Sequence, residues 1–376
     1  MRRLRAEPRD NWQEKVEEAG LIWNPGDRVC WNESAFYEFT ATDVGRLESA
    51  TNELEAMTLA AVRYIIDNKL YARMGIPAIA VPLIEASWEA GEPSLYGRFD
   101  LAYDGVNPPK LLDYDADTPS SLLEAAVVQR NWLRDKFPER GQFNSLHERL
   151  IARWKELASR LPGGPVDFCS MDNAEDLVTI AYLQERAQQA GLETCAFPIN
   201  EIGWDGTGFV GPKDEPLQSV FKLYPWEWMI KDAFARHLGS ASTIWIEPAW
   251  KILLSNKGVL PILWQLYPRH PYLLEASFEG PGLMMSWVKK PLLGREGANI
   301  AWHQPGQDIQ TGGTYGAEGF IYQAMAPERT FDGKFAVLGS WVIGHEEGNA
   351  ACGVGIRESD TPVIGNLSQF VPHLLV

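Results

Sequence analysis

The chain has 376 residues, of which 45% are hydrophobic and 22% are charged, and its formal net charge at pH 7 is −16. This composition is typical of a soluble globular protein, and the length exceeds what one hydrophobic core usually supports. The negative charge argues against a nucleic-acid partner, which needs a basic surface, and it favours a cationic substrate such as a polyamine.

The sequence also argues against membrane insertion and export. No run approaches the ~18–20 apolar residues that a membrane helix needs. The basic start at residues 1–5 is not followed by the apolar stretch of a signal peptide. The four cysteines lie far apart and form no Cys-x-x-Cys pair, so neither a disulfide framework nor a cysteine metal site is expected. We therefore expect a cytoplasmic protein that makes no membrane contact.

Helical and extended patterns alternate in the first part of the chain. Apolar spacing predicts a helix over residues 46–69. Two strands, 96–103 and 110–115, are expected to form a hairpin around the Asn-Pro-Pro turn at 107–109. Ser120 or Ser121 would cap a helix that runs to about Lys136.

The next segment predicts an α/β unit with a parallel sheet. A helix over 146–161, a strand over 166–171, a helix over 174–190 and a strand over 193–199 follow one another. Such alternation is typical of parallel sheets covered by helices.

After about residue 215 the pattern becomes strand-rich. A strand over 220–224 is followed by helices over 226–237 and 257–267. Alternating segments around glycine-rich turns then predict an antiparallel sheet, with strands over 287–291, 319–326, 335–344 and 351–356. We therefore divide the chain into two closely packed parts, 1–215 and 216–376.

Three aspartates stand on alternate residues at the end of the 110–115 strand. In an extended strand, Asp113, Asp115 and Asp117 would point to one side and repel one another. Mg²⁺ would relieve that repulsion, because it prefers hard oxygen ligands. An acidic turn that simply ends the strand explains the alternation equally well.

Three further segments have both a functional and a purely structural interpretation. The lysines at 289–290 and the glycine turn after them could hold phosphates, or could form an ordinary turn between strands. The glycine-dense segment 311–319 could serve as a mobile lid or as a surface turn. Arg357 could face a ligand from a strand of small residues, or could be an exposed strand terminus.

Long motifs in this chain resemble those of the synthetase domain of bifunctional glutathionylspermidine synthetase, an ATP-grasp ligase. The resemblance covers nearly the whole chain and is greatest to stand-alone acid–amine ligases without the amidase domain. The motifs are Arg98-Phe99-Asp100, residues 113–120, 222–228, 255–264, 288–300 and 353–357. The resemblance implies an α/β ATP-grasp fold, with a pre-ATP-grasp-like region over 1–215, a nucleotide-binding region over 216–376 and a lid loop over 295–319. No Cys/His module precedes the ligase region, so we expect no amidase activity.

The resemblance also implies residue roles. Asp100, Asp113 and Asp115 match Mg²⁺ ligands, although the family has Glu and Asn at the latter two positions. Arg98 matches an arginine that contacts phosphate and stabilises the transition state, and Arg357 matches an arginine of the lid. The remaining ATP-binding candidates begin with Phe99, Asp100, Lys257 and Lys290, together with Glu296 and Gly297 of a nucleotide-covering loop. Gln323, Ala324, Met325 and Ala326 match a hinge segment that reads adenine by backbone hydrogen bonds, and Pro362, Val363 and Ile364 would close that pocket.

For the two substrates to be joined, the resemblance implies a peptide-like acid and an amine. Thr118 and Ser120 match hydroxyl residues that hold the acid, and Glu175 and Asp176 lie near an acidic pair of the peptide or amine site. Leu223 and Trp228 stand where the family has threonines, which weakens the case for glutathione itself. The expected activity is an ADP-producing ligase that uses Mg²⁺ and ATP.

Two other functions are consistent with parts of the sequence. The 15 tryptophans and paired carboxylates are compatible with a glycosidase, but most of these tryptophans lie in apolar stretches and the lysine-rich motif at 288–300 would have no role. A nucleotide-binding pseudoenzyme that regulates a partner would not need the retained Arg98, lysines and carboxylates. We therefore favour the ligase.

Overall fold

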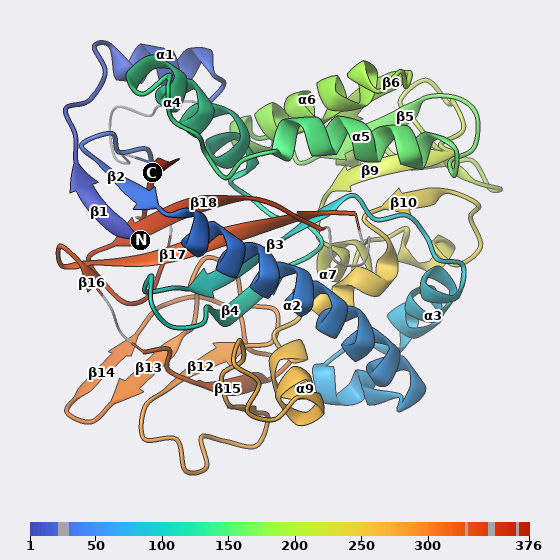
Figure 1. The fold of residues 1–376 in the computed structure, drawn as a ribbon. Coiled ribbons are helices and arrows are strands. Elements are labelled where there is room, and N and C mark those ends of the chain that lie inside the picture. The colour runs from blue at the N-terminus through green and yellow to red at the C-terminus, as the bar shows by residue number, and fades with distance from the viewer. Residues whose placement is uncertain (22–29, 328–329, 345–349, 366–367) are drawn as a thin grey trace.

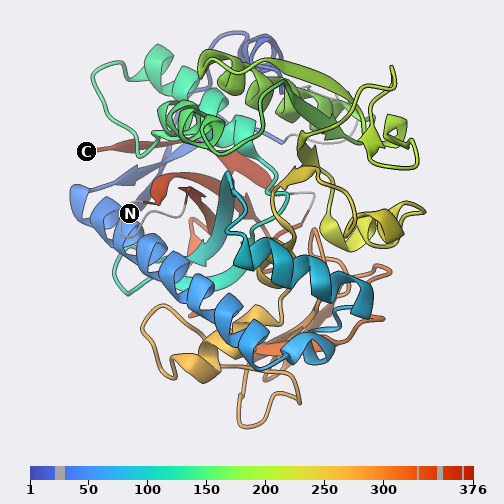
Figure 2. The same ribbon diagram turned by 90° about the vertical axis from the view of Figure 1, so that its right-hand side faces the viewer.

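A computed structural model describes residues 1–376 except 22–29, 328–329, 345–349 and 366–367. The described residues form mixed parallel and antiparallel sheets with helices packed around them (Figure 1). Figure 2 shows the same arrangement from the side. In the described part of the chain no helix is long and apolar enough to cross a membrane.

The central antiparallel sheet joins distant parts of the chain. Its strand order is β19-β18-β17-β3-β4, with β16 paired to β17. The strands are β3 (Tyr96–Ala102), β4 (Lys110–Asp115), β16 (Thr330–Phe331), β17 (Lys334–Ile343), β18 (Ala351–Ser359) and β19 (Gln369–Val371). The predicted hairpin is confirmed, and so are the antiparallel strands predicted over 335–344 and 351–356. The strands predicted over 287–291 and 319–326 belong to a different antiparallel sheet, so the single sheet expected from the sequence is two.

Helix α2 (Ala41–Asp67) packs against β17, β18 and α9 (Figure 1). It begins at a capping box, in which the Thr40 hydroxyl accepts from the Asp43 N–H and the Asp43 carboxylate accepts from the Thr40 N–H. The predicted helix over 46–69 is therefore confirmed, with an earlier start.

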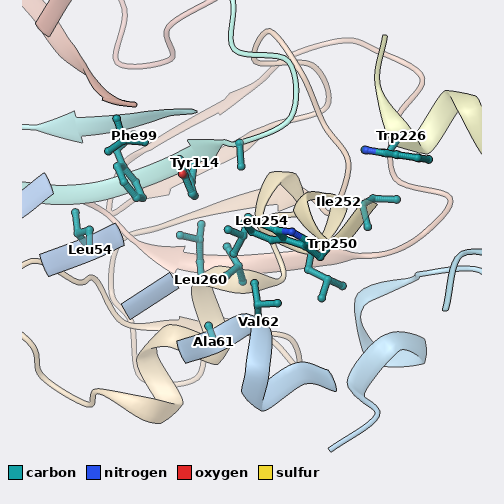
Figure 3. Packing of buried hydrophobic residues seen from close by; sticks show 14 of the residues in the cluster. Leu54, Ala61, Val62, Phe99, Tyr114, Trp226, Trp250, Ile252, Leu254 and Leu260 are labelled. Atoms are coloured by element: carbon teal, nitrogen blue, oxygen red, sulfur yellow. The ribbon is translucent and has the colours of Figure 1, made fainter. Parts of the chain in front are cut away.

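The core lies between α2, α9 and one face of the β3–β4 hairpin (Figure 3). Phe99 of β3 and Tyr114 of β4 are stacked, with ring centroids 3.8 Å apart. Both rings belong to the same buried cluster as Leu54 of α2 and Leu260 of α9. Because side chains alternate along a strand, the polar neighbours of Phe99 and Tyr114 lie on the opposite face of the hairpin.

A second sheet is entirely parallel and has the order β10-β9-β5-β6. Its strands are β5 (Val166–Ser170), β6 (Thr194–Pro198), β9 (Ser219–Leu223) and β10 (Ile244–Ile246), with helices α5 (Leu146–Ala158) and α6 (Ala174–Gln189) beside it (Figure 1). The predicted α/β unit is confirmed. Both this sheet and the central sheet cross residue 215, and the two-part division of the chain stays a prediction.

A third sheet has the order β11-β15-β12-β13-β14 and is antiparallel. Its strands are β11 (Ala276–Ser277), β12 (Trp287–Pro291), β13 (Ala301–Gln304), β14 (Gln307–Gln310) and β15 (Phe320–Ala324). The β13–β14 hairpin lies inside the segment 295–319, which the sequence predicted as a loop. It turns at Gly306, whose φ is 88°, and buries Trp302.

The remaining elements are shorter or peripheral. A three-stranded sheet consists of β1 (Arg2–Arg5), β2 (Ala35–Phe39) and β20 (His373–Leu375), and a two-stranded one of β7 (Gly203–Trp204) and β8 (Phe209–Val210). The other helices are α1 (Trp12–Glu18), α3 (Val81–Glu89), α4 (Gln129–Lys136), α7 (Trp226–Met229), α8 (Ile252–Ser255) and α9 (Val259–Leu266). Short 3-10 helices are η1 (Leu70–Met74), η2 (Ala78–Ala80), η4 (Ile199–Glu201), η5 (Ala235–His237) and η6 (Ala249–Lys251). The π-helix η3 (Glu124–Val128) continues directly into α4.

Two predicted helices differ from the structure. The segment 226–237 forms only the short α7 and then separate turns, because its aromatic side chains have separate partners: the Trp226 indole donates to the Glu247 carbonyl, and His237 stacks on Trp204. Lys257 precedes α9 rather than lying in it, since its N–H donates to the Leu292 carbonyl.

Candidate active site

The polar face of the β3–β4 hairpin brings charged residues together. Across the two strands Arg98 is paired in register with Asp115, and Asp100 with Asp113. These four side chains lie opposite the Phe99–Tyr114 stack. The alternation noted in the sequence therefore places charges on one face, whereas Phe99, predicted to contact ATP, is buried in the core.

This face forms one wall of a cavity of about 720 Å³. Most of the predicted site residues line it. They are Arg98, Asp100, Asp113, Asp115, Thr118, Ser120, Glu175, Asp176, Lys257, Lys290, Glu296, Gly297, Met325, Ala326, Arg357, Pro362, Val363 and Ile364. Three others, Phe99, Gln323 and Ala324, lie outside the lining.

Two arginines bracket Asp100. Arg98 Nε donates to Asp100 Oδ1 at 2.8 Å, and Arg357 Nη2 from β18 donates to Asp100 Oδ2 at 2.8 Å. Burial opposes ionisation of Asp100, but the two guanidiniums outweigh it and lower the pKa of this carboxyl. Arg98 also donates to the Ser120 carbonyl, so its side chain is fixed at both ends.

Gly339 of β17 makes room for Arg98. It lies opposite Asp100 in the neighbouring strand, and a Cβ atom at this position would lie only 2.8 Å from Arg98 Cδ. No ordinary carbon–carbon contact is that short. No sequence pattern marks this glycine, because it is distant in the chain from the arginine that it accommodates.

Two lysines complete the cationic wall. Lys257 Nζ lies 2.7 Å from Asp113 Oδ2. Lys290 Nζ donates to the Leu112 carbonyl and to Gln323 Oε1, both at 2.7 Å. Burial lowers the pKa of Lys290 to about 8, and the nearby Asp113 opposes that shift. Gln323, predicted as part of a backbone hinge, thus positions Lys290 through its side chain.

The aspartates fit Mg²⁺ as donors that act together with a nucleotide. Asp100, Asp113 and Asp115 offer hard carboxylate oxygens on the cavity wall. Among the described residues no three carboxylate, imidazole or thiolate groups form a cluster able to hold an ion alone. Mg²⁺ is usually bound by one or two carboxylates and substrate phosphates, so the donor set present suits an ion that arrives with phosphates.

Asp117, the third alternate aspartate, belongs to the scaffold. Its carboxylate accepts from Lys222 Nζ and from the Trp226 N–H, both at 2.7 Å, and it is fully buried. Burial raises the pKa of Asp117 to about 6, against the attraction of Lys222. The turn that it anchors presents Thr118 and Ser120 to the cavity.

The predicted adenine-binding segment lies at one side of the cavity. The N–H groups of Ala324 and Met325 donate to the carbonyls of Glu275 at 2.7 Å and Ser286 at 3.1 Å, so neither is available to a ligand. Met325 and Ala326 nevertheless line the cavity, as residues 362–364 also do. Gly297 has a φ of 71°, and a Cβ atom added to it would lie 2.9 Å from the Ile364 carbonyl oxygen. The covering loop and residues 362–364 therefore contact one another at this glycine.

An acidic pair lies at the start of α6. Asn173 caps this helix by accepting from the Asp176 N–H at 3.0 Å. Burial raises the pKa of both Glu175 and Asp176, and Glu175 also faces Asp176 and Glu296. This end of the cavity thus carries two neighbouring carboxyl groups, whereas the sheet wall carries cations and carboxylates together.

Sequence reasoning missed Arg295 and Glu227, which meet across the cavity. Arg295 Nε donates to Glu227 Oε1 at 2.9 Å, and Nη1 donates to Thr118 Oγ1 at 3.0 Å. Both residues stand inside motifs that the resemblance had already highlighted, so their position was a signal that could have found them. Leu223 and Trp228, the departures from the family pattern, also line the cavity.

Known proteins resemble the whole chain. The model of the family described as glutathionylspermidine synthase preATP-grasp matches residues 3–376. A "putative acid–amine ligase" of Haemophilus influenzae is 42% identical over 364 residues, which cover 92% of this chain and 91% of that protein.

Longer relatives are more distant. Trypanothione synthetase of Crithidia fasciculata is 28% identical over 345 residues, covering 83% of this chain and 52% of that protein. The bifunctional glutathionylspermidine synthetase/amidase of Escherichia coli is 27% identical over 382 residues, covering 92% of this chain and 60% of that protein. The chain thus spans little more than half the length of these two relatives.

A solved structure has a similar fold. The glutathione synthetase-like effector GSS30 of Globodera pallida, in its apo form, superimposes with a TM-score of 0.60, covers 97% of this chain and 95% of its own, and is 8% identical. At that identity the likeness concerns the fold alone. Together with the family match, it confirms the predicted α/β ATP-grasp fold.

Proposed function

The chain belongs to the glutathionylspermidine synthase preATP-grasp family, and on that premise we propose that it is an ATP-dependent carboxylate–amine ligase. The observation that carries this proposal is the convergence of Arg98, Lys257, Lys290 and Arg357 on one wall of the cavity, among three carboxylates. Phosphoryl transfer depends mainly on positioning and on neutralising negative charge, which is what such a wall provides.

The proposed reaction has two steps. A carboxylate oxygen of the acid attacks the γ-phosphorus of ATP, and ADP leaves, so that an acyl phosphate forms. The ammonium then loses a proton to solvent, the neutral amine nitrogen attacks the carbonyl carbon, inorganic phosphate leaves, and the nitrogen releases a second proton to solvent. Without activation the carboxylate has no good leaving group, which is why a nucleotide is needed.

The residues have distinct roles in this proposal. Lys257 and Lys290 bind the nucleotide phosphates, and Arg98 and Arg357 stabilise charge on the transferred group. Asp100, Asp113 and Asp115 would hold Mg²⁺, which shields phosphate charge when bound. Residues 325–326 and 362–364 enclose the base.

We further propose substrates by chemical class. Thr118 and Ser120 bind the carboxylate end of a peptide-like acid, and the acidic end of the cavity at Glu175 and Asp176 attracts an amine such as a polyamine. The net charge of −16 favours approach of the cationic substrate. Leu223 and Trp228 make the cavity more apolar than glutathione requires.

The test is ADP release, measured for a matrix of peptide-like acids and polyamines with Mg-ATP. We expect one pair to accelerate ADP formation, with the amide seen by mass spectrometry. If the protein binds Mg-ADP but every pair fails, the ligase proposal is wrong and a regulatory nucleotide-binding protein becomes the better explanation. Sugar release from chromogenic glycosides without ATP would instead indicate a glycosidase.

The metal assignment has a test of its own. Asp113→Ala removes a ligand from the cavity wall, and we expect Mg²⁺-dependent ATP turnover to fall at least about 100-fold. Asp67→Ala, at the exposed end of α2, is the matched control and should retain turnover. Turnover that survives in Asp113→Ala with unchanged Mg²⁺ dependence contradicts the assignment.

A further inference from the structure

The guanidinium of Arg295 fills a position suited to an organic cation. It lies 2.8–2.9 Å from Glu227 Oε1, donates to Thr118 Oγ1 at 3.0 Å, and has its central carbon 6.0 Å from the ring centroid of Trp228. A carboxylate, a hydroxyl and an aromatic face are groups that bind ammonium ions well. Within the cavity, Arg295 therefore occupies the kind of site that an amine would use.

This position lies where two cavities meet. A second cavity of about 550 Å³ has Trp228, Arg295, Tyr315 and Thr311 in its lining. Trp228 and Arg295 line the main cavity as well. Trp228 is 38% exposed. An amine that entered through the second cavity would pass it and would meet the Arg295–Glu227 pair before reaching Thr118.

Glu227 needs a cationic partner at all times. Its side chain is 5% exposed, and among the described residues Arg295 is the one cation within ion-pair distance. Loss of the partner of a buried carboxylate strongly destabilises the folded protein. If Arg295 moves, another positive charge must take its place.

The segment after Arg295 has an uncommon backbone conformation. Glu296 and Asn299 have φ values of 52° and 53°, in the left-handed region that non-glycine residues seldom adopt. Such conformations are frequent in segments that switch between arrangements. Arg295 thus directly precedes a segment with the backbone conformation that is frequent in switching segments.

We propose that Glu227 and Trp228, beside Thr118, form the recognition site for the ammonium group of the amine substrate, and that Arg295 occupies this site until nucleotide binds. The inference rests on the proposed ligase function. The γ-phosphate of bound nucleotide, and then the acyl phosphate beside Thr118, draw the Arg295 guanidinium toward their negative charge. The ammonium replaces it at Glu227. Amine binding is thereby linked to the presence of a phosphate group, so that the amine binds tightly once nucleotide or acyl phosphate is in the cavity.

The test measures amine binding without turnover. Spermidine is titrated calorimetrically into the protein with and without Mg²⁺ and the non-hydrolysable analogue AMP-PNP. We expect the wild type to bind spermidine at least about tenfold more tightly with the analogue. Arg295→Ala should bind it tightly with or without the analogue, because Glu227 is already exposed to it. Glu227→Gln should lose the analogue-dependent gain.

Controls separate recognition from a structural role. Glu148→Gln removes a carboxylate that pairs with Arg130 at 2.7 Å outside the cavity and should behave as the wild type. Trp228→Phe should retain binding that Trp228→Ala weakens. Mg-ADP binding shows that each variant is folded.

Three outcomes would overturn the proposal. The first is a Glu227→Gln variant that binds spermidine as the wild type does. The second is an Arg295→Ala variant that binds Mg-ADP but still needs the analogue in order to bind spermidine. The third is that spermidine, putrescine and agmatine all fail to bind, both to the wild type with the analogue and to Arg295→Ala. Failure of the ligase proposal looks different, because ADP release is then absent while analogue-linked amine binding persists.

Discussion

Replacing Gly339 by alanine tests whether β17 positions Arg98. The added Cβ would lie 2.8 Å from Arg98 Cδ, and Arg98 is fixed by its bonds to Asp100 and to the Ser120 carbonyl. Overpacking of this kind costs about 1–3 kcal/mol. If Arg98 yields, Mg-ADP affinity should fall about 5- to 150-fold. If the backbone yields, the melting temperature should fall instead.

A double-mutant cycle identifies the cause. Once Arg98→Ala has removed the clashing atoms, adding Gly339→Ala should have little further effect on affinity or on melting temperature. Gly45→Ala is the control, because Gly45 lies in α2 with nothing within 4 Å of an added Cβ, and there alanine should be neutral or stabilising. A Gly339→Ala effect of the same size in both backgrounds would refute the explanation.

Three other predictions concern the neighbouring groups. Burial lowers the pKa of Lys290 to about 8 from an ordinary 10.5, so Lys290 should take up a proton when Mg-ADP binds at pH 8.5. This uptake makes the binding enthalpy depend on the buffer, and Lys290→Met should abolish that dependence. The same shift makes the contribution of Lys290 to stability increase with pH between about pH 8 and 10.5, because the unfolded chain binds more protons there. A difference in melting temperature between wild type and Lys290→Met that does not change with pH over this range would contradict the shift. Gln323→Leu removes the amide oxygen that accepts from Lys290 and the amide N–H that donates to the Leu111 carbonyl. The affinity for Mg-ADP should then fall about tenfold, and an affinity equal to that of the wild type would rule out the positioning role. Asp117→Asn leaves Lys222 buried without its carboxylate and should cost about 3–5 kcal/mol of stability while the folded protein still binds Mg-ADP; loss of binding without loss of stability would place Asp117 in the site.

Local patterns predicted much of the fold. The apolar spacing of α2, the turn between β3 and β4, and the helix–strand alternation from α5 to β6 each depend on neighbouring residues, so the sequence contains them. The helix predicted over 226–237 was wrong, because Trp226 and His237 pack against partners far from them in the chain.

The candidate site was only partly predictable, for the same reason. Alternation placed Asp113 and Asp115 on one face, but it also included Asp117, which the distant Lys222 and the Trp226 N–H hold in the core. The side-chain role of Gln323 and the space above Gly339 depend on contacts between strands that are far apart in sequence. Motif resemblance supplied the lysines, which no local pattern distinguishes from ordinary turn residues.

The place of β3 between β4 and β17 has a consequence for how the protein folds. During synthesis β3 and β4 emerge more than 200 residues before β17, so the hairpin presents an unpaired strand edge until β17 has been synthesised. Such an edge invites pairing with other chains. The pairing of β3 with β17 has a high contact order and is expected to be slow. Arg357 of β18 can lie beside Asp100 only after β17 and β18 have joined the hairpin, so the contact between the two arginines and Asp100 forms late, and nascent chains would depend on chaperones until that point.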